Sequence, residues 1–247
     1  MKSIQENRPF AVFDIDGTLI RWQLYHAITE RLIDLNYIDH DKLVKLNIAK
    51  KNWEHRVNKS AYRNYESQLV NYLNDILTTI PTKIFETVCL DVFNFHKNRV
   101  YRYTSDLIKQ LKSKNYLLFL ISGSPDVIVK MIARYYQFDD YGGSKLIKNE
   151  LFLNHYEIIM THENKASHLN ELVSQHFATF NNSIGIGDSD GDIELLKLVE
   201  HPIAFNPNDK LLDHAMNNGW EIVIERKNVI YKLEFKNGNY ILANSKK

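Results

Sequence analysis

Hydrophobic and polar positions change their spacing twice along this chain. The first apolar run, residues 9–15, is short and continuous, which predicts a buried strand. Two acids, Asp14 and Asp16, stand at its end, so this strand would deliver both carboxylates to its carboxyl edge. Residues 22–100 then show helical spacing with few glycines, which predicts about four helices without strands.

The expected helices of residues 22–100 are separated by polar or proline-containing breaks near Asp39, at 58–60 and at 80–81. After Tyr103 the pattern becomes an alternation of strands and helices. We expect strands at 116–121, 183–186, 203–205 and 220–224, and helices that start at Ser105, Pro125, Asn164, Asp190 and Asp209. This alternation predicts a parallel α/β sheet that binds ligands at the carboxyl ends of its strands. The helical stretch is therefore an insertion after the first strand.

Two segments are less regular. Residues 142–157 contain a Gly-Gly pair and mixed spacing, for which we expect a loop with short β-segments. Near the carboxyl end, β-rich flanks surround Asn237-Gly238, which is a strong signal for a two-residue hairpin over residues 229–243. Since exposed sheet edges are usually protected, we expect this hairpin to cover an edge of the sheet.

Composition narrows the range of partners. The 247 residues include 31 Lys plus Arg and 30 Asp plus Glu, so no field of one sign attracts nucleic acid or an anionic membrane. A small-molecule partner fits better. Cys89 is the single cysteine, which excludes an internal disulfide and a clustered thiolate metal site. The amino-terminal segment lacks the apolar stretch of a signal peptide, and the longest apolar runs are too short for a membrane span, so we expect a cytoplasmic protein.

The first chemical motif is Asp14-Ile15-Asp16-Gly17, where the first strand stops and a glycine permits a sharp turn. With the turn beginning between the two acids, the first carboxylate is placed to attack a substrate. The second offers an acid side chain and a backbone carbonyl for a metal. An Asp-x-Asp pair at a strand end also serves as a turn or helix-capping device, so this motif alone leaves both interpretations open.

Three further acids, Asp188, Asp190 and Asp192, follow the strand predicted at 183–186. Such a density of like charge is unfavourable unless a cation compensates it. The spacing does not fit an EF-hand, which needs glycine at Ile193, and a dinucleotide fingerprint would need glycine at Asp190.

Two weaker signals lie between these motifs. Ser122 and the backbone amides around Gly123 precede a helix in which Ser124 is the expected N-cap and Pro125 the first residue, and such a helix start is a phosphate cradle. Lys165 begins a later helix, where a cation is slightly unfavourable unless it lowers the repulsion between a phosphate and a carboxylate. Taken alone, the segment around Ser122 could be an ordinary strand-to-helix turn. Taken alone, Lys165 could be a solvated lysine.

Together and in this order, DIDGT at 14–18, the strand-ending Ser122, Lys165 and GDSDGD at 187–192 resemble motifs one to four of the haloacid dehalogenase superfamily of phosphohydrolases. The resemblance covers essentially the whole predicted core, and the phosphoserine phosphatase-like branch is the most similar part of the superfamily. The helical stretch between motifs one and two resembles the small helical cap of this family.

The resemblance implies a fold and a domain organisation. The fold is a Rossmann-like three-layer α/β/α core with a parallel sheet, formed by residues 1–20 and 101–247, plus an inserted all-helical cap at 21–100. The implied activity is that of a Mg²⁺-dependent phosphatase acting on a small phosphorylated metabolite, with no nucleic acid and no membrane as partner.

The resemblance also implies roles for single residues. Asp14 is the nucleophile that forms an aspartyl-phosphate, and Asp16 is the general acid that protonates the leaving oxygen and later activates water. Mg²⁺ would be bound by Asp14, the carbonyl of Asp16 and Asp188, and Asp192 would orient these ligands or Lys165.

The remaining implied roles concern the phosphate and one acid. Ser122, the amide of Gly123 and Lys165 would bind the transferring phosphoryl group. We expect Asp190 to cap the following helix rather than to bind the metal.

The sequence is less informative about the substrate. Phosphoserine phosphatases carry a glutamate in the first cap segment that pairs with the substrate amine, and an ungapped count from motif one places Gln23 there. A neutral glutamine lacks this charge, which disfavours phosphoserine itself. Arg56, like Arg21 and Arg63, is a candidate to bind a second anionic group of the substrate, or is a surface arginine. Helical spacing favours core packing over pocket lining for the aromatic residues Trp22, Tyr25, Trp53, Tyr62 and Tyr65.

Two alternatives remain. A phosphotransferase or phosphomutase would use the same residues with an acceptor hydroxyl in place of water. A non-catalytic phosphate-binding protein would be favoured if Asp14, Asp16, Lys165 or Asp188 were missing, and all four are present.

Overall fold

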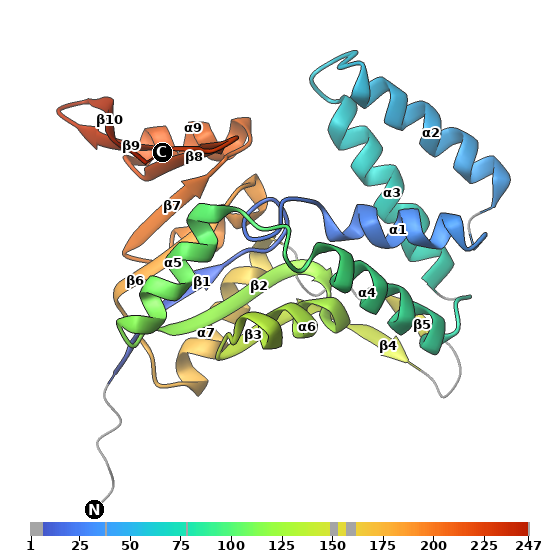
Figure 1. The fold of residues 1–247 in the computed structure, drawn as a ribbon, viewed down its shortest axis with the longest axis horizontal. Coiled ribbons are helices and arrows are strands. Elements are labelled where there is room, and N and C mark those ends of the chain that lie inside the picture. Colours follow the sequence, from blue (N-terminus) through green and yellow to red (C-terminus); the bar gives the residue numbers. More distant parts are fainter. Residues whose placement is uncertain (1–6, 38, 78, 149–152, 157–161, 247) are drawn as a thin grey trace, which may run out of the picture.

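The computed structural model describes residues 7–37, 39–77, 79–148, 153–156 and 162–246, and shows a central sheet flanked by helices (Figure 1). The strands of this sheet are β1 (Pro9–Phe13), β2 (Leu117–Pro125), β3 (Asp140–Ser144), β6 (Thr179–Gly187), β7 (His201–Phe205), β8 (Glu221–Arg226), β9 (Val229–Lys236) and β10 (Asn239–Lys246). Their order across the sheet is β10-β9-β8-β7-β6-β1-β2-β3. Two short strands, β4 (Leu146–Lys148) and β5 (Leu153–Tyr156), pair separately.

The strand order brings three strand ends together. β1 pairs in parallel with β2 on one side and with β6 on the other, so that Phe13 lies opposite both Leu120 and Ile186. The chain crosses over on both sides of β1, and in such sheets the crevice beyond the carboxyl ends at this point is the usual ligand site. The first motif follows β1, the second lies in the last residues of β2 and the fourth begins at the end of β6, so all three meet at one edge.

The sheet is covered on both faces because its central strands are apolar on both sides. Alternate residues of β1 point to opposite faces, Ala11 and Phe13 to one buried cluster and Phe10 and Val12 to the other. The first face packs against α5 (Arg102–Ser113) and α6 (Asp126–Tyr136). The second packs against α7 (His162–Gln175), α8 (Ile193–Leu196) and α9 (Asp209–Asn218). The structure confirms the predicted Rossmann-like three-layer core.

In the described residues of the inserted segment (residues 21–100), all the regular elements are helices, and Val100 forms an isolated bridge with Ile20. The segment contains α1 (Leu24–Asp34), α2 (His40–Glu54), α3 (Ala61–Leu77) and α4 (Thr82–His96), which matches the predicted helices and breaks. The first break stops at Asp39, where α2 begins. The Asp39 side chain caps α2 by accepting a hydrogen bond from the amide of Asp41 at 2.8 Å. No helix in the described residues has the length and apolar character that crossing a membrane requires. The proposed division into a core and a cap at residues 20/21 and 100/101 stays a prediction.

Two local expectations are confirmed. The stretch from residue 142, expected as a loop with short β-segments, contains the end of β3 and the short strands β4 and β5 within its described residues. The terminal hairpin forms with Asn237 and Gly238 at φ of 52° and 81°, and its strand β9 pairs with β8, so the hairpin covers that edge of the parallel strands. A third expectation was wrong. The helix expected over 190–199 is a 3₁₀ turn, η1 (Asp190–Asp192), followed by the short α8.

An aromatic cluster packs α1 against α2 and α3. The ring centroids of Trp53, Tyr62 and Tyr65 lie 6.2, 6.1 and 5.2 Å from that of His26. His26 is 2% exposed, and its Nε2 atom has no hydrogen-bond partner within the described part of the chain. Burial lowers the pKa of His26 to about 4, so the imidazole is neutral at pH 7 and packs as one more ring.

This buried histidine predicts a pH dependence of stability. The unfolded chain protonates it below its ordinary pKa of about 6.5, whereas the folded protein does so only near 4. The free energy of unfolding therefore falls as the pH drops from about 6.5 towards 4, by at most about 1.4 kcal/mol per pH unit from this group. Urea unfolding gives the free energy of unfolding at pH 7 and at pH 5. The difference between these two values should be smaller in His26→Phe than in the wild type. His55→Phe, at an exposed position of the same segment, should keep the wild-type difference. If His26→Phe kept the wild-type difference, the pH dependence would not come from the lowered pKa of His26.

Candidate active site

Asp14 directly follows β1 and lies at the centre of the site. Its amide donates a hydrogen bond to the carbonyl of Ile186 at 3.0 Å, which joins it to the neighbouring strand β6. Gly17 then turns the chain at a φ of 81°, and its amide donates to the carbonyl of Ile20 at 3.1 Å. The Asp14 side chain is buried. The local backbone thus fixes one carboxylate at the bottom of the crevice.

Lys165 lies between two of the site's carboxylates. Its Nζ atom is 2.8 Å from Asp14 Oδ1 and 2.7 Å from Asp192 Oδ1, and all three side chains are buried. Lys165 reaches them from the first turn of α7. Burial by itself lowers the pKa of Lys165, but the Asp14 and Asp192 carboxylates outweigh it and raise the pKa above its ordinary value. The lysine is therefore a fixed positive charge beside Asp14.

Asp192 is held at both of its carboxylate oxygens. While Oδ1 pairs with Lys165, Oδ2 accepts hydrogen bonds from the amides of Asp188 at 3.2 Å and Ser189 at 3.1 Å. A Cβ at Gly187 would lie 2.5 Å from the Cβ of Asp192, so only glycine permits this close approach. Asp192 therefore orients both Lys165 and the loop that carries Asp188.

Three carboxylates are close enough to share a cation. Ligand atoms of Asp14, Asp188 and Asp192 lie within 4.8 Å of one another. The Asp188 carboxylate has no hydrogen-bond or ion-pair partner in the described residues. Burial, and then the charge of Asp14, raise the pKa of Asp188 well above its usual range. Burial also raises the pKa of Asp14 to about 7, although Lys165 opposes this shift.

These features fit a divalent cation bound by oxygen. A cation would compensate the charge that Asp188 and Asp14 carry in their buried surroundings. Since both oxygens of Asp192 are already used, Asp14 and Asp188 are the carboxylates of the cluster with oxygens left for a metal. Mg²⁺ commonly uses few protein carboxylates and completes its shell with water and phosphate oxygens, which suits this donor set.

Asp16 is buried in a separate hydrogen-bond network. Its Oδ2 accepts from the hydroxyl of Ser122 at 2.9 Å and from that of Ser124 at 2.7 Å, and its Oδ1 accepts from the amide of Leu24 at 2.6 Å. Burial raises the pKa of Asp16, while these hydrogen bonds oppose the rise. The network joins the loop after β1 to β2 and to the start of α1.

The expectation that Ser124 caps the helix was wrong. β2 continues to Pro125, α6 begins at Asp126, and its N-cap position is Pro125. Residues i and i+2 of an extended strand share a face, so Ser122 and Ser124 both point at Asp16. If the strand had been predicted to extend to Pro125, Ser124 would have been placed on the same face as Ser122 and named as a partner of Asp16.

Two other residues of the motifs have structural contacts. The carbonyl of Gly123 accepts a hydrogen bond from the hydroxyl of Ser144 at 2.7 Å, which joins β2 to β3. Asp190 does not cap the helix as expected, because Ser189 is the N-cap. Instead, Asp190 accepts hydrogen bonds from Asn208 Nδ2 and Lys210 Nζ, both at 2.8 Å, and lies outside the carboxylate cluster.

The candidate substrate residues lie at different distances from this centre. Gln23 occupies the N-cap position of α1, next to the Leu24 amide that contacts Asp16. Arg56 is exposed in the turn after α2, at a φ of 50°, and contacts none of the four motifs within the described residues. Arg63 approaches the site instead, with Nη2 3.8 Å from Asp190 Oδ2. One turn further along α3 is Glu66, which the sequence analysis did not single out.

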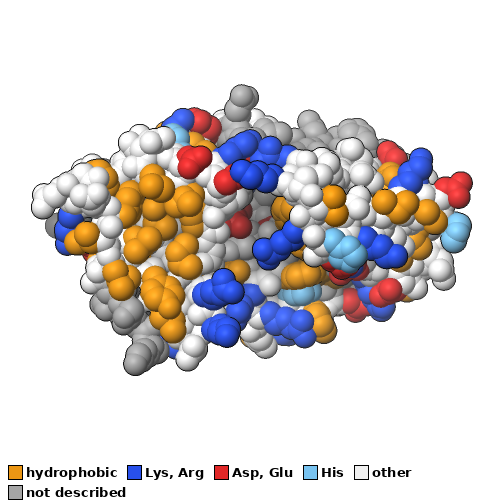
Figure 2. All heavy atoms as spheres, turned by 90° about the horizontal axis from the view of Figure 1, so that it is seen from above, with side chains coloured by type: hydrophobic (Ala, Val, Ile, Leu, Met, Phe, Trp, Pro, Cys, Tyr) orange, Lys and Arg blue, Asp and Glu red, His pale blue; other side chains and the backbone are white. Residues whose placement is uncertain are grey.

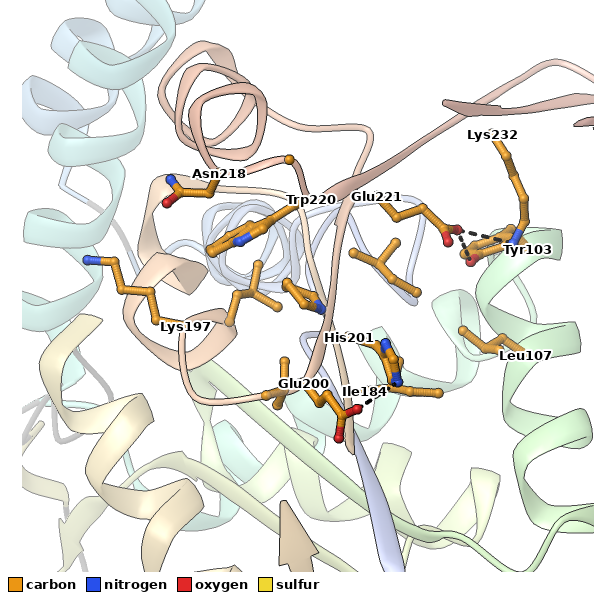
Figure 3. Close-up of a pocket in the computed structure, with 15 residues that line it drawn as sticks. Tyr103, Leu107, Ile184, Lys197, Glu200, His201, Asn218, Trp220, Glu221 and Lys232 are labelled. Carbon is orange, nitrogen blue, oxygen red and sulfur yellow. Dashed lines mark hydrogen bonds and ion pairs between the residues drawn. The ribbon is translucent and has the colours of Figure 1, made fainter. Parts of the chain in front are cut away.

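Figure 2 shows the face of the molecule that carries these strand ends, with a hollow between the sheet and the inserted helices and acidic side chains inside it. A second hollow, of about 700 Å³, is shown in Figure 3. It is lined by His201 and Glu221, which are the first residues of β7 and β8, and by Ile184 of β6. None of the motif residues lines it, so this hollow is separate from the candidate active site.

Comparison with known proteins identifies the family. The sequence matches the haloacid dehalogenase-like hydrolases over residues 11–197. It is 21% identical over 226 residues to a histidinol-phosphatase from Neisseria meningitidis serogroup C (strain 8013), which covers 86% of this chain and 97% of the relative. The chain therefore belongs to the haloacid dehalogenase-like hydrolases, as its motifs predicted.

Solved structures share the fold. A protein of unknown function from Bordetella pertussis Tohama I superposes with a TM-score of 0.69 at 16% identity, covering 89% of this chain and 99% of that one. A phosphoserine phosphatase solved as an analogue of its phospho-aspartyl intermediate gives a TM-score of 0.61 at 18% identity, covering 90% and 95%. The predicted likeness to the phosphoserine phosphatase-like branch is thus confirmed for the fold.

The close approach of Gly17 to Asp188 gives a test of the site's packing. A Cβ at Gly17 would overlap Asp188 Oδ2 and lie 2.7 Å from its Cγ, whereas a Cβ at Gly238 would meet nothing within 4 Å. Both glycines have a φ of 81°, so Gly17→Ala and Gly238→Ala share the conformational cost of about 1–2 kcal/mol. We expect urea unfolding to show an additional loss of about 1–3 kcal/mol for Gly17→Ala. Equal losses would mean that Asp188 moves aside without cost.

Proposed function

We propose that this protein is a Mg²⁺-dependent phosphatase that hydrolyses a small phosphate monoester through an aspartyl-phosphate on Asp14. The observation that carries the proposal is the position of Lys165, paired with Asp14 and Asp192 while Asp188 keeps an unpartnered carboxylate among the described residues. Such a centre presents a nucleophile, a fixed cation and oxygen ligands to one point. A phosphate ester needs all three.

In the first step, an oxygen of Asp14 attacks the phosphorus and the bond between phosphorus and the ester oxygen breaks. The leaving oxygen takes a proton from Asp16, whose raised pKa favours the acid form. In the second step, a water molecule gives its proton to Asp16 and attacks the phosphorus. The bond between Asp14 and phosphorus then breaks, which releases inorganic phosphate and restores both carboxyl groups.

The remaining residues stabilise charge during both steps. Lys165 and the hydroxyl of Ser122, together with the amide of Gly123, are proposed to bind the phosphoryl oxygens. Asp14, the Asp16 carbonyl and Asp188 are the proposed ligands of Mg²⁺, which when bound offsets the negative charge of phosphate and carboxylate. Asp192 positions Lys165 through its 2.7 Å ion pair.

The relatives support a small substrate. One is named a histidinol-phosphatase and several structural neighbours are phosphoserine phosphatases, one of them solved with its substrate bound. We therefore propose a small phosphorylated metabolite as the substrate, without a nucleic-acid or membrane partner, and a cytoplasmic location. The inserted helices beside the site favour a small ester over a large protein substrate.

The first test is phosphate release from a panel of small esters by the wild type and by Asp14→Asn. We expect release that requires Mg²⁺ and falls on the order of a thousandfold or more in Asp14→Asn, because an amide is not a nucleophile. Asp213→Asn, at an exposed position on α9, is the matched control and should retain wild-type turnover. Circular dichroism checks that each variant remains folded.

Three outcomes would contradict the proposal. Equal release from wild type and Asp14→Asn would exclude the aspartyl-phosphate. Release only when an acceptor alcohol is added would identify a phosphotransferase. The absence of release from every ester, with phosphate still bound in calorimetry, would identify a non-catalytic phosphate-binding protein.

A further inference from the structure

One face of α3 is turned towards the candidate active site. Arg63 is its direct contact, with Nη2 3.8 Å from Oδ2 of Asp190 in the loop after β6. Residues three and four positions apart on a helix share a face. Glu66 therefore lies on the same side as Arg63 and Tyr62, and the Tyr62 hydroxyl donates a hydrogen bond to Glu66 Oε1 at 3.4 Å.

Glu66 carries its charge in surroundings that disfavour it. The side chain is half-buried, and within the described residues no lysine, arginine or histidine forms an ion pair with it. Burial is the largest cause that raises the pKa of Glu66, and the nearby Asp16 and Asp190 raise it further, while Tyr62 and Arg63 oppose the rise. A positive group beside Glu66 would remove this penalty.

Aromatic rings adjoin the carboxylate. The ring centroid of Tyr62 is 5.3 Å from that of Trp53, and Trp53 stacks on Tyr65 at 5.3 Å. Burial raises the pKa of Tyr62, and the charges of Glu66, Asp188 and Asp16 also raise it, which places this ring near the catalytic carboxylates. A carboxylate beside aromatic faces is the combination that binds ammonium and imidazolium groups.

We propose that Glu66, oriented by Tyr62, binds a cationic group of the substrate, so that the preferred ester carries a protonated amine or imidazolium close to its phosphate. Glu66 supplies from α3 the negative charge that Gln23 lacks at the start of α1. The inference rests on the proposed phosphatase function and names the substrate class of that same site.

The test compares esters of similar size that differ in charge. Phosphoethanolamine and n-propyl phosphate form one such pair, and phosphoserine and histidinol phosphate extend the cationic set. We expect the wild type to have a higher kcat/KM for cationic esters. In Glu66→Gln the ratio of cationic to uncharged kcat/KM should fall on the order of tenfold or more, mainly through KM, because a charge-assisted hydrogen bond is lost.

Glu54→Gln is the matched control, since Glu54 is exposed at the end of α2 in the same inserted segment. It should keep the wild-type ratio. The inference would be overturned if the wild type did not prefer cationic esters, or if Glu66→Gln kept the wild-type ratio. Turnover of n-propyl phosphate would still support the phosphatase function in either case. If the wild type turned over none of these esters, both the inference about Glu66 and the proposed phosphatase function would be contradicted.

Discussion

The buried pairing of Lys165 with Asp14 and Asp192 is the interaction on which the arrangement of the site depends. Ions lose hydration on burial, and only close partners of opposite charge recover that free energy. Here one ammonium lies 2.8 and 2.7 Å from two carboxylates, while Asp188 adds a further acid with an oxygen left for a cation. Burial and the neighbouring carboxylates outweigh the ammonium and raise the pKa of Asp14 to about 7, so the centre has the charge and the free oxygens to bind a cation.

This pairing needs three strand ends at one point, and the sheet provides them. β6, β1 and β2 are neighbours, so the residues at their carboxyl ends meet although more than two thirds of the chain separates Asp14 from Asp188 in sequence. The strand ends were predictable because Asp14, Ser122 and the acids after Ile186 each follow a short apolar run. Strand order was less accessible, but parallel strands joined by helices admit few arrangements. The principal residues of the site could therefore be named before their contacts were known.

Contacts that depend on local geometry were harder to predict. Ser124 has the sequence of an N-cap, yet β2 continues four residues beyond the predicted strand and turns the Ser124 hydroxyl to Asp16. Asp190 resembles a capping acid, but Ser189 occupies that position. Glu66 shows no motif at all, because the orientation of α3 towards the sheet follows from packing and not from helical periodicity. These errors arise where tertiary contacts decide between two locally acceptable conformations.

The inserted helices are stabilised in two parts, and this division separates the proposed catalytic residues from the helix face proposed to bind the substrate. The hydrophobic cluster on one face of the sheet extends without interruption into α1, α4 and the second half of α3, where Leu73 and Leu77 are buried in it. The first half of α3 packs with α2 in a separate small cluster that includes Tyr65 and Leu69. Its direct link to the loop after β6 is the exposed Arg63–Asp190 pair, and such a pair contributes about 0–1 kcal/mol. The helix face that carries Tyr62 and Glu66 is therefore stabilised independently of Lys165 and its carboxylates. Substitutions on this face should therefore leave the fold that positions Asp14 unchanged.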